Sequence, residues 1–144
     1  MSVTDQERAD RSAAAMWQAD AASRWFGMEL VAIGPGCATL RMTVAAHHCN
    51  GHGTAHGGVI FALADSAFAF ACNSYNRQTV AQHNTITYHA PGRAGDVLVA
   101  EATEVARPGR SGLYDVAVRV GDTLIASFRG ASREVPGQHF EETP

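Results

Sequence analysis

Residues 56–74 read HGGVIFALADSAFAFACNS, an apolar segment that carries a single acid, Asp65. From Val59 to Cys72 the segment shows no alternation, is longer than an ordinary buried strand and is rich in Ala. It therefore predicts a helix that is apolar nearly all round and has to be enclosed. An unpaired carboxylate in such an enclosure costs several kcal/mol or becomes neutral through a raised pKa. Asp65 is therefore a candidate functional residue, unless it makes a local hydrogen bond or faces a solvated edge.

The segments on either side of this helix predict strands. The stretch CATLRMTVA at 37–45 alternates apolar and polar side chains, the period-2 pattern of a strand with one buried face. More strand-like segments follow the helix, separated by turn signals at Pro91-Gly92 and Gly121-Asp122. These segments are residues 80–89, 97–106, 113–120 and 123–135.

The two ends of the chain carry different signals. Residues 1–27 predict an N-terminal helix that begins at a Thr4 cap, is rich in Ala and ends at Gly27. Residues 135–144 are polar and predict a flexible tail. The length of 144 residues is that of one domain, so we expect a single domain over 1–144.

The order of these elements indicates the fold class. A long helix that is apolar on all sides needs cover on all sides, and each strand needs a partner for its one apolar face. We therefore expect an α+β domain in which one curved antiparallel sheet wraps around the long central helix, with the N-terminal helix added. This arrangement is the hotdog fold.

Charge and cysteine content exclude several classes of partner. The net charge is −3, and no stretch of Lys and Arg is dense enough to follow a phosphate backbone or an anionic membrane surface. Nucleic acid and membrane are therefore not expected as partners. Three irregularly spaced cysteines, no apolar leader and no apolar run of ~20 residues together predict a cytoplasmic protein.

The start of the central helix suggests the chemistry of Asp65. His56, Gly57 and Gly58 precede or open the helix, where unpaired N–H groups and the positive end of the helix dipole favour a developing negative charge. A glycine there lets a ligand approach the backbone closely. An amide that holds a carbonyl oxygen and a carboxylate that activates water together suggest acyl hydrolysis.

One chain cannot bring these two groups to the same carbonyl. Gly57 and Asp65 are eight residues apart, which is roughly 12 Å along a helix. Two antiparallel copies of the helix, related by a two-fold axis, would place Asp65 of one chain beside Gly57 of the other. We therefore expect a homo-oligomer with two equal sites in each dimer.

The stretch NGHGTAHGGVIFALADSAFAFACNS closely resembles the hotdog thioesterases of the phenylacetate-degradation (PaaI-like) type. The resemblance extends over roughly residues 30–132 and includes TITYHAPGRAGDVLVAEA and GLYDVAVRV. It implies an acyl-CoA thioesterase without a cofactor, with phenylacetyl-CoA or hydroxyphenylacetyl-CoA as the favoured substrate. It also implies an oligomer, since many relatives are tetramers made from two dimers.

The same resemblance implies roles for individual residues. Asp65 is the general base or nucleophile, and the Gly57 amide polarises the thioester carbonyl. Asn50 and His56 shape the loop and orient thioester and water. Some relatives add a hydroxyl residue at the start of the strand after the helix, where this chain has Ala81. For the substrate we expect contacts from Gly58 and, at the phosphates of coenzyme A, from the turn residues Arg107 and Arg110, with Arg93 as a further candidate.

Other sites and functions stay open at this level. The loop contains possible zinc ligands, but their spacing matches no common metal motif, so we expect no metal. They are His47, His48, Cys49, His52 and His56. Cys49 and Cys72 lack an evident base and are weak candidates for a nucleophile. The main alternative is an acyl-CoA binding protein or sensor without turnover, which has no reason to bury Asp65.

Overall fold

The computed structural model describes residues 2–143, which form three α-helices, six strands and one 3-10 turn. The long helix comes after the first two strands, and four strands follow it. The helices are α1 (Asp5–Ala19), α2 (Ala21–Trp25) and α3 (Gly57–Cys72), the 3-10 turn is Ala46–His48, and the strands are β1 (Glu29–Gly34), β2 (Cys37–Thr43), β3 (Thr79–Tyr88), β4 (Val97–Ala106), β5 (Ser111–Val120) and β6 (Thr123–Glu134).

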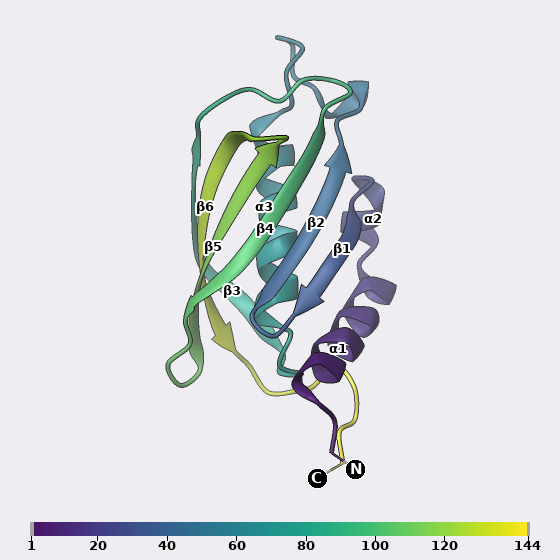
Figure 1. The fold of residues 1–144 in the computed structure, drawn as a ribbon, viewed down its shortest axis with the longest axis vertical. Helices are drawn as coiled ribbons and strands as arrows, with labels where there is room; N and C mark the ends of the chain where they lie inside the picture. Colours follow the sequence, from purple (N-terminus) through teal and green to yellow (C-terminus); the bar gives the residue numbers. More distant parts are fainter. Residues whose placement is uncertain (1, 144) are drawn as a thin grey trace.

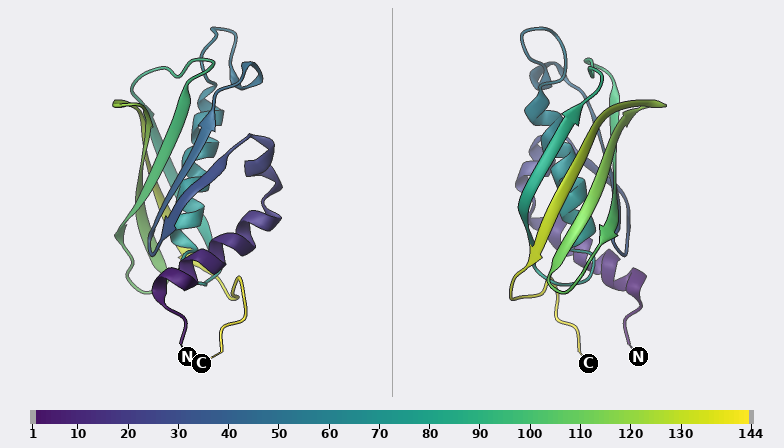
Figure 2. Two further views of the ribbon diagram at one scale, coloured as in Figure 1. Left: turned by 45° about the vertical axis from the view of Figure 1, so that its right-hand side comes forward. Right: turned by 90° about the vertical axis from the view of Figure 1, so that its left-hand side faces the viewer.

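The six strands form one antiparallel sheet in the order β1-β2-β4-β5-β6-β3. The sheet curves around α3, and α1 and α2 lie beside its β1 edge (Figure 1). The turned views of Figure 2 show the same sheet wrapped along the length of the helix. The predicted hotdog fold is therefore confirmed.

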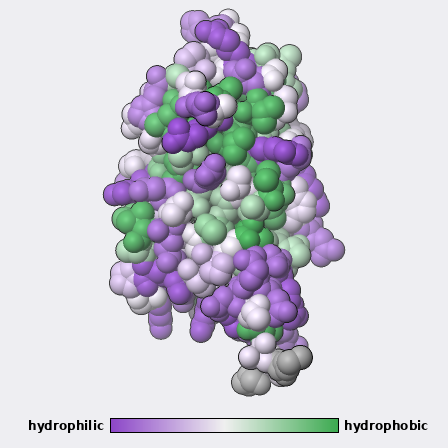
Figure 3. Space-filling view, in the orientation of Figure 1, coloured by the Kyte–Doolittle hydropathy of each residue, from purple (hydrophilic) through white to green (hydrophobic). Residues whose placement is uncertain are grey.

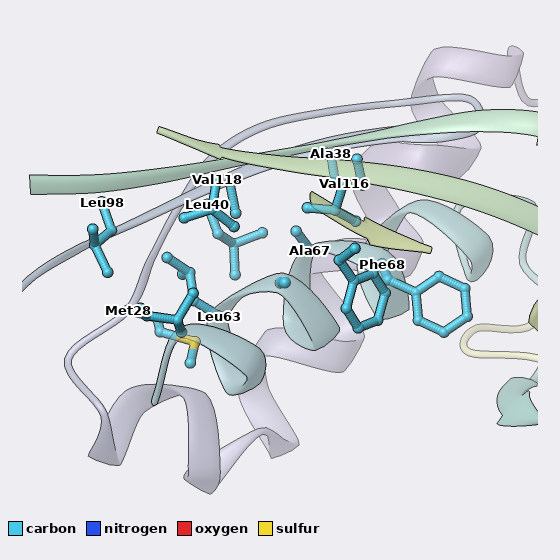
Figure 4. Close-up of a cluster of buried hydrophobic side chains, with 14 of the residues drawn as sticks. Met28, Ala38, Leu40, Leu63, Ala67, Phe68, Leu98, Val116 and Val118 are labelled. Carbon is cyan, nitrogen blue, oxygen red and sulfur yellow. The ribbon is translucent and has the colours of Figure 1, made fainter. Parts of the chain in front are cut away.

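The core lies between α3 and the concave face of the sheet. Leu63, Ala67 and Phe68 of α3 point toward apolar side chains of the strands (Figure 4). Alternate residues of β2 are buried, as the period-2 pattern predicts, and so are alternate residues of β4 and β5. Gly130 is required here, because a Cβ at this position would lie 2.8 Å from the ring of Phe68. Close packing of this kind holds α3 at a fixed position on the sheet.

The side of α3 away from the sheet is not enclosed by this chain. Gly58, Ala62, Asp65 and Ala69 form a stripe along it, and none of them is buried. The prediction of a helix enclosed on all sides is therefore wrong for a single chain. Apart from Asp65, the stripe consists of the smallest side chains, which allow another helix to approach closely.

The predicted N-terminal helix is two helices. Thr4 caps α1 in a capping box with Glu7, as the sequence indicates, but the helix stops at Asp20. The carboxylate of Asp20 accepts hydrogen bonds from the backbone and the hydroxyl of Ser23 at 2.9 and 2.6 Å, and so caps α2. An Asp that bonds nearby backbone favours a cap over a helix interior, which explains the break. Gly27, with φ of +82°, ends α2 as predicted.

Strand β1 was not predicted from the sequence. It forms one edge of the sheet and pairs only with β2, through a bulge between Leu30 and Ala32. The bulge interrupts the alternation of buried and exposed side chains that would have identified the strand.

The residues after β6 make contacts that the prediction of a flexible tail did not include. Glu142 accepts from Arg8 of α1 at 2.6 Å, and the Asn76 side chain bonds the backbone of His139 and Phe140. Arg11 lies over the ring of Phe140. The tail is therefore placed against α1, and both ends of the chain lie at the same end of the molecule (Figures 1 and 2).

The outer face of the sheet is a mixed surface. Green apolar atoms and purple polar atoms alternate over it in Figure 3, which has the orientation of Figure 1 with the sheet in front of α3. Exposed valines of β1 and β4 contribute to it, namely Val31, Val97 and Val105. In residues 2–143, no helix has both the length and the apolar character needed to span a bilayer.

Candidate active site

The start of α3 exposes one backbone amide. His56 is the N-cap, and its Nδ1 accepts from the Gly58 N–H at 2.8 Å, while its carbonyl accepts from Val59 and Ile60. Gly57 occupies the first helical position, where the helix itself offers no acceptor, and its N–H has no partner among the described residues. The Gly57 amide is therefore available for a ligand oxygen. The Gly58 amide is not, so Gly58 can contribute only an open backbone surface.

Tyr88, at the end of β3, holds the same glycine from the other side. Its hydroxyl donates to the Gly57 carbonyl at 2.7 Å, and a Cβ at Gly57 would lie 3.1 Å from that hydroxyl oxygen. The glycine is thus required by a close approach as well as by access for a ligand. Partial burial raises the pKa of Tyr88, so it remains a neutral hydrogen-bond donor at physiological pH. Sequence reasoning missed Tyr88.

Asn50 organises the loop in front of the helix. Its Oδ1 accepts from the His52 N–H at 3.0 Å, and from both the N–H and the hydroxyl of Thr54 at 3.3 and 3.2 Å. The loop is also joined to the β3–β4 connection through a bridge between Thr54 and Arg93. Asn50 therefore acts within this chain on the shape of the loop.

Asp65 lies two turns into α3, on the border between the open stripe and β3. It is half-buried, and Asn84 of β3 donates from Nδ2 to its Oδ1 at 3.2 Å. Desolvation raises the pKa of Asp65, and the hydrogen bond from Asn84 opposes that rise. Oδ2 has no partner among the described residues. A carboxylate with a raised pKa and a free oxygen is suited to take up a proton.

Arg107 and Arg110 do not lie near the helix start in the same chain. Arg107 stacks on Tyr75, just beyond the C-terminal end of α3, with 3.5 Å between its guanidinium carbon and the ring centre. In Figure 1 the β4–β5 loop that carries both arginines is at the bottom of the view and the loop before α3 is at the top. Arg93 is the candidate on the same end as Gly57. A single chain therefore does not bring all of the predicted site residues together.

The histidines and cysteines of the chain do not form a second site. Within residues 2–143, no three side chains of the metal-binding types come together as a ligand set. His48 is buried and accepts from the Ala45 N–H at 2.9 Å, and burial lowers its pKa. Burial raises the pKa of the Cys72 thiol to about 12, which makes it a poor nucleophile.

Comparisons with known proteins agree with this geometry. A family model described as the thioesterase superfamily matches residues 52–127. The acyl-coenzyme A thioesterase PaaI of Escherichia coli (strain K12) is 40% identical over 131 residues, which are 90% of this chain and 94% of that protein. A putative esterase of Archaeoglobus fulgidus is 40% identical over 96 residues, 66% of this chain and 62% of that protein.

Solved structures give the same result. The E. coli PaaI protein from the phenylacetic acid degradation operon superposes with a TM-score of 0.92 at 38% identity, covering 94% of this chain and 99% of that chain. The TT0310 protein of Thermus thermophilus superposes with a TM-score of 0.76 at 38% identity, covering 78% of this chain and 96% of that chain.

Proposed function

This chain belongs to the thioesterase superfamily and is a PaaI-like acyl-CoA thioesterase, and from that premise we propose that its substrates are aryl-acetyl-CoA thioesters. Phenylacetyl-CoA and hydroxyphenylacetyl-CoA are the favoured members of this class. One observation carries the proposal. Over 90% of its length this chain is 40% identical to E. coli PaaI, a thioesterase that is a protein of the phenylacetic acid degradation operon.

In the proposed reaction, the Gly57 amide binds the thioester carbonyl oxygen and Asp65 acts as general base. Asp65 takes a proton from water while the water oxygen bonds to the carbonyl carbon. Collapse of the tetrahedral intermediate breaks the C–S bond, and the proton on Asp65 neutralises the departing thiolate. If Asp65 attacks as a nucleophile instead, the C–S bond breaks as a mixed anhydride forms, and rapid quenching traps this acyl-enzyme. Attack of ¹⁸O-labelled water on the Asp65 carbonyl of the anhydride then places the label in Asp65 in a single turnover, which the general-base route does not.

A second copy of the chain completes the proposed site. Gly57 and Asp65 are separated by roughly 12 Å along α3, and the open stripe of small residues faces away from the sheet. An antiparallel α3 from a partner would cover that stripe and bring the two groups together in trans. The same symmetry moves Arg107 and Arg110 of one chain toward the helix start of the other. We therefore propose a dimer as the catalytic unit, with two dimers forming a tetramer.

A groove beside α3 offers room for the acyl group. It has a volume of about 440 Å³ and lies between α1 and the start of β3. Ala69, one turn beyond Asp65 on the open stripe, forms part of its wall. Apolar side chains of α1, including Met16, line one side, and Asn73 and Gln78 line another. An aromatic ring with or without a hydroxyl group suits this combination.

A substrate panel tests the proposal. Purified protein is assayed for thiol release from acetyl-, hexanoyl-, palmitoyl-, phenylacetyl- and hydroxyphenylacetyl-CoA, with and without a chelator. We expect the highest kcat/KM for the two aryl-acetyl thioesters and no effect of the chelator. A higher kcat/KM for an alkyl chain would refute the substrate class. Tight binding of every thioester without thiol release would favour the alternative, a binding protein or sensor.

A further inference from the structure

Asn84 is partly buried beside Asp65, and half of its side-chain amide is left without a hydrogen bond. Its Nδ2 donates to Asp65 Oδ1 at 3.2 Å, but its Oδ1 is fully covered and has no partner in the part of the chain that the structure describes. A buried acceptor without a donor is a free-energy cost, so a polar residue there needs another reason.

The position of Asn84 depends on an irregularity of β3. The register against β6 shifts between Ala81 and His83, so the strand contains one extra residue there. Beyond this bulge, Asn84 pairs with Gly130 and Ile86 with Phe128, and these residues face α3. A strand without the bulge would turn the opposite side chains toward the helix. The bulge therefore places an amide beside the only acid of α3.

The orientation of the amide follows from its neighbour. A carboxylate oxygen only accepts hydrogen bonds, so the amide has to present its NH₂ group to Asp65. The reverse orientation would bring two acceptor oxygens together. Since Asn84 Oδ1 is covered by this chain itself, a partner subunit cannot supply a donor to that oxygen.

We propose that Asn84 is a positioning residue that holds the Asp65 carboxylate ionised and in one orientation, with Oδ2 directed to the reacting water. It occupies the helix-facing side of β3, on which Ala81 lacks the hydroxyl group that some relatives carry. The role rests on the proposed function of Asp65 as the base. An N–H donor on one oxygen stabilises the charged form and leaves the other oxygen to receive the proton.

No charged side chain competes with Asn84 for this role within residues 2–143. Within residues 2–143, desolvation raises the pKa of Asp65 and the hydrogen bond from Asn84 lowers it. Cys72, two turns along α3, interacts with Asp65 but is neutral at physiological pH, since burial raises its pKa to about 12. A change in the titration of Asp65 on substitution of Asn84 is therefore attributable to the lost hydrogen bond.

Two readouts on Asn84→Leu test the proposal. Leu has a similar volume without donor or acceptor, so the protein should unfold at the same or a slightly higher temperature. The acid limb of the kcat/KM profile should move up by about one pH unit, the size expected for loss of a hydrogen bond to a charged group. Below that limb kcat should fall about ten-fold while KM changes little. Carbon-13 NMR of labelled Asp65 should show the same shift without any substrate.

Control variants make each outcome decisive. Ile86→Leu alters the next helix-facing side chain of β3 and should leave the titration of Asp65 unmoved. Asn84→Asp adds a like charge and should move the limb further up, and Asn84→Ala, which also lacks a donor, replaces Asn84→Leu if the latter does not fold. If the Asp65 titration is the same in Asn84→Leu and wild type, Asn84 is structural and the proposal is wrong. An inactive wild type would instead refute the proposed function, while the NMR titration would still test Asn84.

Discussion

The two ends of α3 carry polar side chains that are used in opposite ways. At the C-terminal end, the side chain of buried Asn73 bonds the carbonyls of Ala69 and Thr79 and the N–H of Thr79, and buried Ser74 donates to Ala71 and accepts from Gly36. These groups have their hydrogen bonds made within the chain. Such saturation is typical of side chains that stabilise a fold.

From the start to the middle of α3, and on the facing strand β3, hydrogen-bonding capacity is left over. The Gly57 amide, Asp65 Oδ2 and Asn84 Oδ1 have no partner in the described residues. Each of these groups costs stability while it is unpaired and desolvated. The contrast supports the proposal that the helix start and Asp65 bind the reacting part of the substrate, whereas the hydrogen bonds at the C-terminal end stabilise the fold.

The largest expected effect is the loss of turnover when Asp65 is substituted. In Asp65→Asn, kcat for phenylacetyl-CoA should fall about 10²–10⁴-fold, because a positioned base is lost while the side-chain volume is kept. KM should change little. Steady-state thiol release measures both constants, and wild-type turnover in the variant would remove Asp65 from the mechanism.

Mixing two inactive variants tests whether the helix start of one chain acts with Asp65 of the other. Asp65→Ala lacks the base, and Asn50→Ala loses the hydrogen bonds that shape the loop. In a mixed dimer both lesions fall in one site and leave the other intact. Random reassortment makes about half of the dimers mixed, so activity should return to roughly a quarter of wild type. Verified heterodimers that stay inactive would place both groups in one chain's site.

A substitution at the saturated end should affect stability without affecting turnover. Ser74→Ala removes the acceptor of the Gly36 N–H and the donor to Ala71, so the free energy of unfolding should fall by about 1–3 kcal/mol. Its kcat/KM at a temperature where it is folded should equal that of wild type. Urea denaturation and thiol release measure the two effects, and a large loss of kcat/KM would contradict the division of α3 into two ends.

The smallest effect concerns the stability cost of the acid itself. The pKa of Asp65 is raised in the folded chain, so the folded state binds its proton more tightly than the unfolded state does. Stability from this group is therefore lost as pH rises through the folded pKa. Asp65→Asn should have a slightly higher Tm than wild type at pH 7. The difference should vanish below pH ~4, where Asp65 is protonated in both states, and a lower Tm at pH 7 would show that Asp65 stabilises the fold.

Local pattern was sufficient for most of the secondary structure and for part of the site. The apolar run of α3 and the alternation in β2 and β4 to β6 are set by neighbouring residues, so periodicity identified them. The single acid in that run and the glycines before it pointed to acyl hydrolysis for the same reason. Edge strand β1 and the break at Asp20 escaped because a bulge and a local cap interrupt the period.

Contacts between distant segments were decided only by the tertiary structure. Asn84 and Tyr88 reach Asp65 and Gly57 because the bulge at Ala81–His83 changes which face of β3 meets the helix. One extra residue reverses the direction of every side chain beyond it. The amino-acid sequence of the strand does not show at which residue the bulge occurs. The sequence by itself thus determined the elements and the chemical groups, whereas packing between β3 and α3 determined which groups meet.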